Sequence, residues 1–212
     1  MRLFFLVFLS LLPGTTLQAQ ANKPGNFDYY VLALSWSANW CALTGDARGD
    51  PQCDAGRDHT FVLHGLWPQY EQGYPSNCHA ETSDPSRDDT ARMADIMGGS
   101  GLAFYQWKKH GRCSGMTARD YFTTLRAAYA SVTIPPVFAM VNKDITIAAP
   151  VVQDAFLDSN PQLAADQVTV TCKQGLIQEV RICLTRDLAP RACGPDVSRD
   201  CTLPDAGLGA VR

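Results

Sequence analysis

The stretch FVLHGLWPQ, residues 61–69, places a histidine directly after a short β-prone run and before a glycine, an aromatic residue and a proline. We expect a short strand over residues 60–63 that delivers His64 at its end. The following residues, 73–89, are rich in Gly, Pro, Ser, Asn and Asp and predict a loop. Because histidine titrates near neutrality, a histidine at such a strand end is a candidate for proton transfer.

Patterns on both sides of this stretch predict a mixture of strands and helices. Residues 28–37 are apolar, aromatic and strand-like. Helical periodicity or helix-capping residues mark four later segments: residues 90–97, 100–110, 117–129 and 150–158. Residues 167–172 and 175–183 alternate polar and apolar side chains, and the turn between them predicts a hairpin. This order favours an α+β fold with a mainly antiparallel sheet and several packed helices.

The amino-terminal residues have the pattern of a secretory signal peptide. Arg2 is followed by an apolar run over residues 3–12 and by Ala-Gln-Ala at 19–21. The run is too short for a permanent membrane anchor. We therefore expect a signal peptide at 1–20, a single domain at 21–212, and a secreted or periplasmic protein that does not bind membranes.

The chain contains eight cysteines, at positions 41, 53, 78, 113, 172, 183, 193 and 201. An even number in an exported chain predicts four disulfides. A metal site is the alternative, but the sequence has no Cys-x-x-Cys pair, and spacings of 8 to 59 residues suit bridges better. Eight cysteines allow 105 pairings, so their number leaves the connectivity open.

Composition and charge limit the class of ligand. A chain of 212 residues with 46% hydrophobic and 18% charged residues is long enough to bury a core of its own. Its formal net charge of −3 argues against a protein that binds polyanions over its whole surface. A nucleic acid would therefore have to bind at a local site.

A second histidine lies in the string FYQWKKHGRC, residues 104–113. On the expected helix, Gln106, Lys109 and His110 have the spacing i, i+3 and i+4 and share one face. A carboxamide, a cation and an imidazole together can form an anion pocket that contains a proton-transfer group. The helix dipole favours the cationic form of His110, while the charge of Lys109 opposes it. The alternative is an ordinary solvated helix end.

Taken together, the two strings resemble the two active-site segments of the ribonuclease T2 family, which are secreted acid-base endoribonucleases. Residues 64–68, HGLWP, match the first segment, and Trp107, Lys109, His110, Gly111 and Cys113 match the second. The likeness extends to residues 27–41 and 168–183. It implies a disulfide-stabilised α+β fold of the ribonuclease T2 type, and makes residues 21–212 the catalytic domain.

The resemblance implies a reaction without metal or cofactor. His110 would take the proton of the ribose 2′-OH, and His64 would protonate the departing 5′-oxygen. Lys109 would stabilise the negative charge of the transition state. The expected product is a 2′,3′-cyclic phosphate, which is slowly hydrolysed to the 3′-phosphate. The substrate would be single-stranded RNA and not DNA, because the 2′-OH is the nucleophile, and a monomer is expected.

Three positions depart from the pattern common in the family. Tyr105 and Gln106 stand where the second segment usually has His-Glu, and Gln69 stands where many relatives carry Asp to read a base edge. Tyr105 can still donate to phosphate but brings no charge. Gln106 can position a neighbour but cannot titrate, so we expect a slow enzyme with low base specificity. A catalytically weak or inactive RNA-binding member of the same scaffold is the alternative.

Base contacts follow from the same comparison. Trp67 is the candidate for stacking a base, with a buried tryptophan that supports the His64 strand as the alternative. Gln69 and Tyr74 are candidates for further base contacts. A zinc hydrolase that uses both histidines and an acidic ligand is a third reading, but the sequence lacks a short-spaced metal motif.

The resemblance also supplies a disulfide pairing. It implies Cys78–Cys113, which would tie the loop after His64 to the end of the helix that carries His110. It further implies Cys172–Cys201 and Cys183–Cys193, and this leaves Cys41 and Cys53 as the fourth pair.

Overall fold

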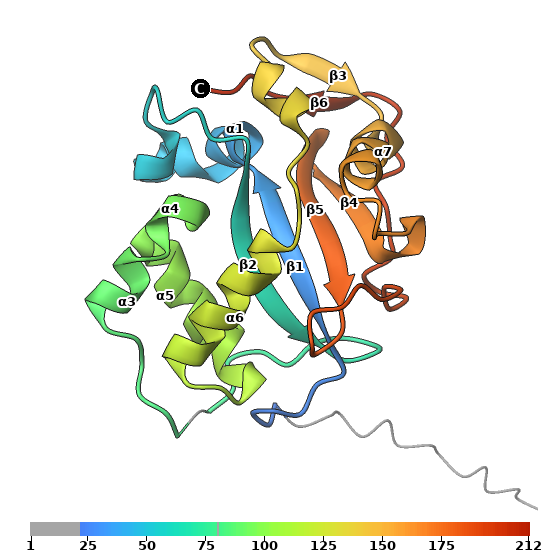
Figure 1. Cartoon of the computed structure of the whole chain (residues 1–212). Helices are drawn as coiled ribbons and strands as arrows, with labels where there is room; N and C mark the ends of the chain where they lie inside the picture. Colours follow the sequence, from blue (N-terminus) through green and yellow to red (C-terminus); the bar gives the residue numbers. More distant parts are fainter. Residues whose placement is uncertain (1–21, 80) are drawn as a thin grey trace, which may run out of the picture.

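A computed structural model describes residues 22–79 and 81–212, so the signal peptide predicted at 1–20 lies outside the described residues. In the described part a twisted sheet runs through the middle of the molecule, with strand order β2-β1-β5-β6-β3 and with β4 paired to β5 (Figure 1). The strands are β1 Tyr29–Trp36, β2 Phe61–Gln69, β3 Ile145–Ile147, β4 Val168–Lys173, β5 Leu176–Leu184 and β6 Ala206–Leu208.

Strand pairing agrees with the predicted fold class. All pairs in the described sheet are antiparallel except β5 with β6, which meet in parallel at Leu176 and Gly207. The predicted hairpin is confirmed as β4 and β5, and residues 174–175 form its turn with positive φ at both positions. The protein is therefore an α+β fold with a mainly antiparallel sheet.

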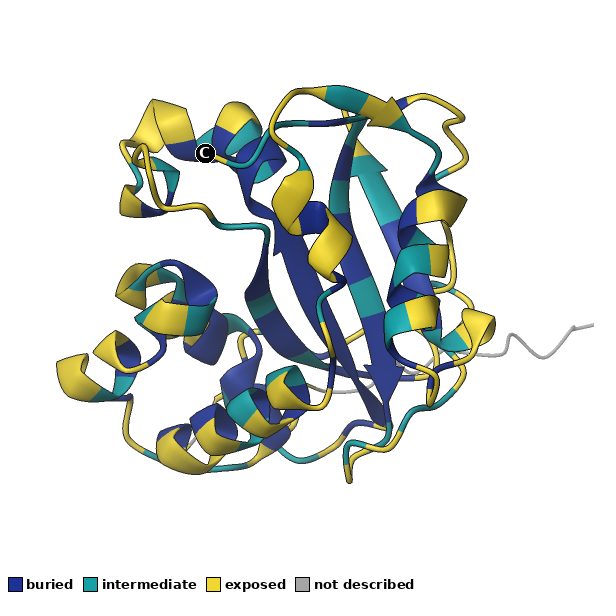
Figure 2. Ribbon diagram, turned by 45° about the horizontal axis from the view of Figure 1, so that its top comes forward, coloured by how far each residue is buried: buried dark blue, intermediate teal, exposed yellow. Residues whose placement is uncertain are grey.

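The α-helices in the described residues are α1 Ser37–Trp40, α2 Asp46–Arg48, α3 Arg87–Ala91, α4 Ala94–Met97, α5 Ser100–Lys109, α6 Ala118–Ala130 and α7 Ala149–Ser159. Helices α4, α5 and α6 pack against β2 and α7 packs against β4 on one face of this sheet, while α1 and α2 follow the end of β1. Alternate residues of β1, such as Leu32 and Leu34, join the large core with Tyr121 of α6 and Phe156 of α7. Figure 2 shows the buried surfaces of the helices turned toward the sheet and their exposed surfaces turned outward.

The opposite face of the sheet has a separate, smaller apolar cluster. Tyr29 and Val31, the other set of residues in β1, pack there with Cys183 and Val197. The large core therefore lies on the helical side, and the second face stays open enough to hold polar side chains.

The prediction that the strand ends directly before His64 was wrong. Strand β2 continues to Gln69, and His64 forms a bulge, because Ala33 pairs with Gly65 while Leu34 pairs with Leu63. Such a bulge can redirect a side chain without ending the strand. Pro68 is tolerated in β2 because an edge strand has backbone donors that need no partner.

The helix predicted at 90–97 is two short helices, α3 and α4. The first begins earlier than predicted because Ser86 caps it: the Ser86 hydroxyl accepts from the Asp89 amide at 3.1 Å, and Asp89 accepts from the Ser86 amide at 3.0 Å. The loop predicted at 73–89 is shortened accordingly. Within the described chain, no helix has the length and apolar character needed to cross a membrane.

The eight cysteines form four disulfides. Three are the pairs that the family resemblance implied, Cys78–Cys113, Cys172–Cys201 and Cys183–Cys193, and the fourth is the remaining pair, Cys41–Cys53. Each bridge of this kind typically stabilises a fold by about 2–4 kcal/mol. Two of them, Cys78–Cys113 and Cys183–Cys193, lie next to segments that shape the site described below.

Candidate active site

A cavity of about 510 Å³ lies on the open face of the sheet. All eight site residues predicted from the sequence line it: His64, Trp67, Gln69, Tyr74, Tyr105, Gln106, Lys109 and His110. The first three come from β2 and the last four from α5 and its end, although about 40 residues of chain separate the two groups. The packing of α5 against β2 brings them together.

His64 lies at the centre of a charged network. Its Nδ1 is 2.5 Å from Oε1 of Glu179, a residue that is 1% exposed. The guanidinium of Arg181 donates to the other carboxylate oxygen of Glu179 at 2.9 and 2.8 Å. Burial alone would raise the pKa of the Glu179 carboxyl, but the hydrogen bonds and charges of His64 and Arg181 outweigh it and lower that pKa to about 2. Glu179 is therefore a carboxylate positioned to stabilise a protonated His64.

His110 has the opposite environment. It is 4% exposed, and its Nδ1 has no hydrogen-bond partner among the described residues. Burial, followed by the charges of Lys109 and His64, lowers the pKa of His110 to about 3. The helix dipole considered above does not offset burial, and the imidazole is neutral over the physiological range. The cavity thus holds one neutral imidazole and one that is paired with a carboxylate.

These pKa shifts predict how stability depends on pH. A group whose pKa is lowered by folding stabilises the native state above its unfolded pKa and loses this contribution as the pH falls. For His110 the loss runs from about pH 6.5 down to about 3, and for Glu179 from about pH 4.5 down to about 2. We expect the free energy of unfolding in urea to decrease between pH 7 and 4, and less steeply in His110→Ala. An equal slope in both proteins would contradict the assignment.

Trp67 packs between the two histidines. Its ring stacks on His110, with centroids 5.2 Å apart and an interplanar angle of 26°, and meets His64 edge-on at 5.2 Å. The Trp67 indole N–H donates to Oε1 of Gln106 at 2.8 Å, and Gln106 is buried. The ring therefore fixes the relative position of both imidazoles, which is close to the supporting role considered as the alternative for Trp67.

The hydrogen bond between Trp67 and Gln106 requires a glycine at position 65. A Cβ at position 65 would come within 2.5 Å of both Gln106 Oε1 and Trp67 Nε1. We therefore expect Gly65→Ala to break the Trp67–Gln106 hydrogen bond. It should lower kcat for the RNA cleavage that the family resemblance implies by about tenfold or more, because catalysis depends on placement within an ångström. The matched control is Gly101→Ala, whose Cβ meets nothing within 4 Å and which should leave kcat unchanged.

The end of α5 is held from outside the helix. His110 leaves helical geometry, with φ −122°, although its amide still donates to the Gln106 carbonyl at 2.9 Å. The Lys109 carbonyl accepts from the Asn77 amide at 2.8 Å. The neighbouring Cys78–Cys113 disulfide then fixes the loop after β2 to this helix end. The string at residues 104–113 is therefore linked covalently to the loop that follows the string at residues 61–69.

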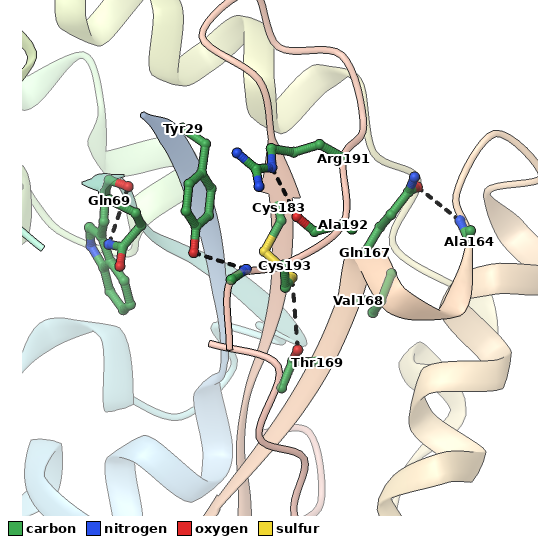
Figure 3. The surroundings of a disulfide bond; sticks show 12 residues. Tyr29, Gln69, Ala164, Gln167, Val168, Thr169, Cys183, Arg191, Ala192 and Cys193 are labelled. Atoms are coloured by element: carbon green, nitrogen blue, oxygen red, sulfur yellow. Dashed lines mark hydrogen bonds between the residues drawn. A yellow bond between two sulfur atoms is a disulfide. The ribbon is translucent and has the colours of Figure 1, made fainter. Parts of the chain in front are cut away.

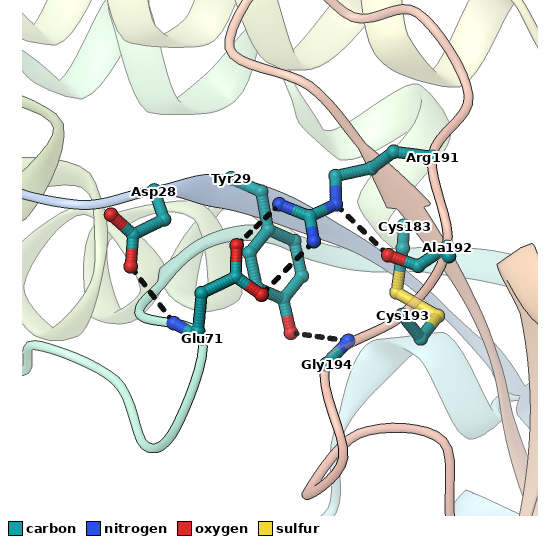
Figure 4. Close-up of polar contacts among 8 residues, drawn as sticks. All are labelled: Asp28, Tyr29, Glu71, Cys183, Arg191, Ala192, Cys193 and Gly194. Atoms are coloured by element: carbon teal, nitrogen blue, oxygen red, sulfur yellow. Dashed lines mark hydrogen bonds and ion pairs between the residues drawn. A yellow bond between two sulfur atoms is a disulfide. The ribbon is translucent and has the colours of Figure 1, made fainter.

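The turn before Tyr74 is held by the carboxy-terminal loop, residues 185–205, which connects β5 to β6. The Gly73 amide donates to Asp196 Oδ2 at 2.7 Å, and Arg191 makes two hydrogen bonds with the Glu71 carboxylate, at 2.8 and 3.0 Å (Figure 4). The Tyr74 ring itself is 52% exposed, with its centroid 6.0 Å from that of His110. Tyr74 is thus an accessible ring beside the neutral imidazole.

That loop is anchored on β1 and β5. Figure 3 shows the Cys183–Cys193 disulfide beside Tyr29, and the Gly194 amide donates to the Tyr29 hydroxyl at 3.2 Å. The Arg191 guanidinium lies 4.3 Å from the centre of the Tyr29 ring. Gln69, by contrast, directs its amide nitrogen to the carbonyls of its own strand, at residues 67 and 68. Gln69 is buried, although it lines the cavity.

The sequence interpretation missed Glu179 and Arg181. Both lie in β5, in the stretch that was used only for its likeness to the family. A possible signal was a glutamate in a strand otherwise dominated by buried apolar residues, because such residues are rarely fully buried unless paired. Assigning the partner needed the register, which places Glu179 opposite Ser35 of β1.

Comparisons with known proteins point to one family. The model of the ribonuclease T2 family matches residues 27–193. The chain belongs to the ribonuclease T2 family. It is 40% identical over 121 residues to a ribonuclease of Aeromonas hydrophila, covering 57% of this chain and 54% of that protein. It is 30% identical over 126 residues to a probable ribonuclease of Haemophilus influenzae, covering 54% of this chain and 46% of that one.

The chain spans about half the length of these curated relatives. Two solved structures share the fold at lower identity. The RNase-related protein from Calystegia sepium superposes with a TM-score of 0.67 at 20% identity, covering 88% of this chain and 98% of that one. Human RNase T2 superposes with a TM-score of 0.56 at 16% identity, covering 85% and 96%. For this ribonuclease T2 family member, they support the fold alone.

Proposed function

We propose that the protein is an endoribonuclease that cleaves single-stranded RNA by general acid-base transphosphorylation. The observation that carries this proposal is the contrast between two imidazoles in one cavity: His110 is buried and neutral, while His64 is paired with the Glu179 carboxylate. A reaction that removes one proton and donates another needs this kind of contrast.

In the proposed reaction His110 accepts the proton of the ribose 2′-OH. The 2′-oxygen then attacks phosphorus, and the bond from phosphorus to the 5′-oxygen breaks. His64 donates its proton to that leaving oxygen, so the products are a 2′,3′-cyclic phosphate and a free 5′-OH. Lys109, which also lines the cavity, would stabilise the charge that develops on the phosphate oxygens.

Several properties follow from this proposal. RNA is cleaved and DNA is not, because the 2′-OH is the nucleophile. The substrate supplies its own nucleophile, so we propose that neither a metal nor a cofactor takes part. Four disulfides suit an oxidising compartment, which supports a secreted or periplasmic location. We further propose low base specificity, since Gln69 offers a neutral amide, and a monomer as the active form.

The test is digestion of a short oligoribonucleotide and its DNA counterpart by the purified, oxidised protein between pH 4 and 8, with EDTA present. The expected products are 2′,3′-cyclic phosphate ends from RNA and intact DNA. Absence of RNA cleavage would favour the weak or inactive RNA-binding alternative, which Gln106 and Tyr105 motivate. Loss of activity on EDTA treatment would instead revive a metal-dependent mechanism.

A further inference from the structure

The cavity extends well beyond the two imidazoles. Gln69, at one end, pairs with Tyr29 at the start of β1, while Glu179 pairs with Ser35 near the end of the same strand. Six residues of strand separate these positions, which corresponds to about 20 Å. Both Gln69 and Glu179 line the cavity, so it is longer than the reacting atoms require.

Two cations line the end that lies away from Tyr74. They are Arg48, at the end of α2, and Lys173, at the end of β4. Strand β4 pairs Thr171 with Glu179 and then continues two residues further, so Lys173 lies on the same face about 7 Å along the strand direction. We call Arg48 and Lys173 the distal cation pair.

The distal cation pair is not neutralised by the protein. Among the ion pairs of the described residues, none includes Arg48 or Lys173. The acidic neighbours of Arg48 have other partners: Asp46 pairs with Arg212, and Asp50 accepts from the Gln52 amide at 3.0 Å. Both cations are therefore available for an anionic ligand.

The wall that carries Arg48 is closely packed. Residues Cys41–Gly45 form a π-helix, which is fixed by the Cys41–Cys53 disulfide. Gly45 lies so close to Trp40 and to the Cys53 sulfur that an added Cβ would come within 2.6 Å of both. Thr44 of this segment lines the cavity with Arg48. π-Helical segments are rare in proteins and often lie at functional sites.

We propose that the distal cation pair binds a second phosphodiester of the RNA chain, one nucleotide away from the bond that is cleaved. This inference rests on the proposed function and extends it: the preferred substrate is an oligonucleotide rather than a dinucleotide. It also accounts for how a chain with net charge −3 binds a polyanion, because the cations needed gather in the cavity.

The experiment compares dinucleoside monophosphates with and without an added terminal phosphate, at the 5′ or the 3′ end. For the wild type we expect one of the two added phosphates to raise kcat/KM about tenfold. The variant Arg48→Gln/Lys173→Gln should lose this gain and keep its kcat on the unphosphorylated dinucleotide. The control Arg87→Gln/Lys143→Gln removes the same charge from exposed positions outside the cavity and should keep the gain.

A gain that is equal in the variant and the control, or no gain in the wild type, overturns the inference. If the wild type cleaves none of these substrates, the proposed function fails. Calorimetric binding of the same compounds then tests whether the distal cation pair binds a phosphate. Tighter binding of the phosphorylated compound that disappears in Arg48→Gln/Lys173→Gln then supports it, and tighter binding that persists overturns it.

Discussion

Replacement of His110 by alanine is expected to lower kcat for RNA cleavage by about three orders of magnitude, or about 4 kcal/mol of barrier. His110 is the imidazole that is neutral at the pH of the reaction, because burial and the charge of Lys109 lower its pKa to about 3. Without it, the other imidazole that lines the cavity is His64, which the proposed reaction uses as the donor to the leaving oxygen. Single-turnover cleavage of a defined oligoribonucleotide measures the effect directly.

The matched control is His59→Ala. Burial lowers the pKa of His59 as well, but the residue does not line the cavity, so kcat should stay within about twofold. Thermal unfolding of both variants separates a catalytic loss from a loss of folded protein. A His110→Ala enzyme that retains more than a tenth of wild-type kcat while folded would contradict the assignment of the base.

Residue type and local spacing were enough to predict several of the residues that line the cavity. Both histidines, Lys109 and Trp67 lie in strings that identify them, and the structure places all of them in one cavity. The hairpin at 167–183 followed from alternation and from the turn residues between the two segments, because period-two patterns are a direct consequence of strand geometry. These features could be predicted because they depend on residues that are close together in the sequence.

The features that escaped prediction depend on register and packing. A bulge at His64 has no local signature, since it results from a one-residue mismatch between β1 and β2. The role of Glu179 can be assigned only when the register of β5 against β1 is known. The neutral state of His110 was also inaccessible, because the helix dipole and Lys109 could be weighed from sequence but burial could not.

Glu179→Gln is expected to lower kcat by about a hundredfold while most of the protein remains folded. Glu179 accepts from His64 through one oxygen and from Arg181 through the other, whereas glutamine has a single acceptor oxygen and can keep only one of these contacts. It also lacks the charge that stabilises a protonated imidazole. The transfer of a proton from His64 to the leaving oxygen is then less well supported. We therefore expect kcat to fall with little change in KM, a split that a general distortion of the cavity would not produce.

The control for Glu179→Gln is Asp95→Asn, which removes a carboxylate from an exposed ion pair with Arg126. Exposed pairs contribute little, so its stability should change by less than about 1 kcal/mol and its kcat should be that of the wild type. Removing one charge from the buried Glu179 network should cost more, about 3 kcal/mol. A folded Glu179→Gln enzyme with unchanged kcat would show that the reaction does not depend on this carboxylate.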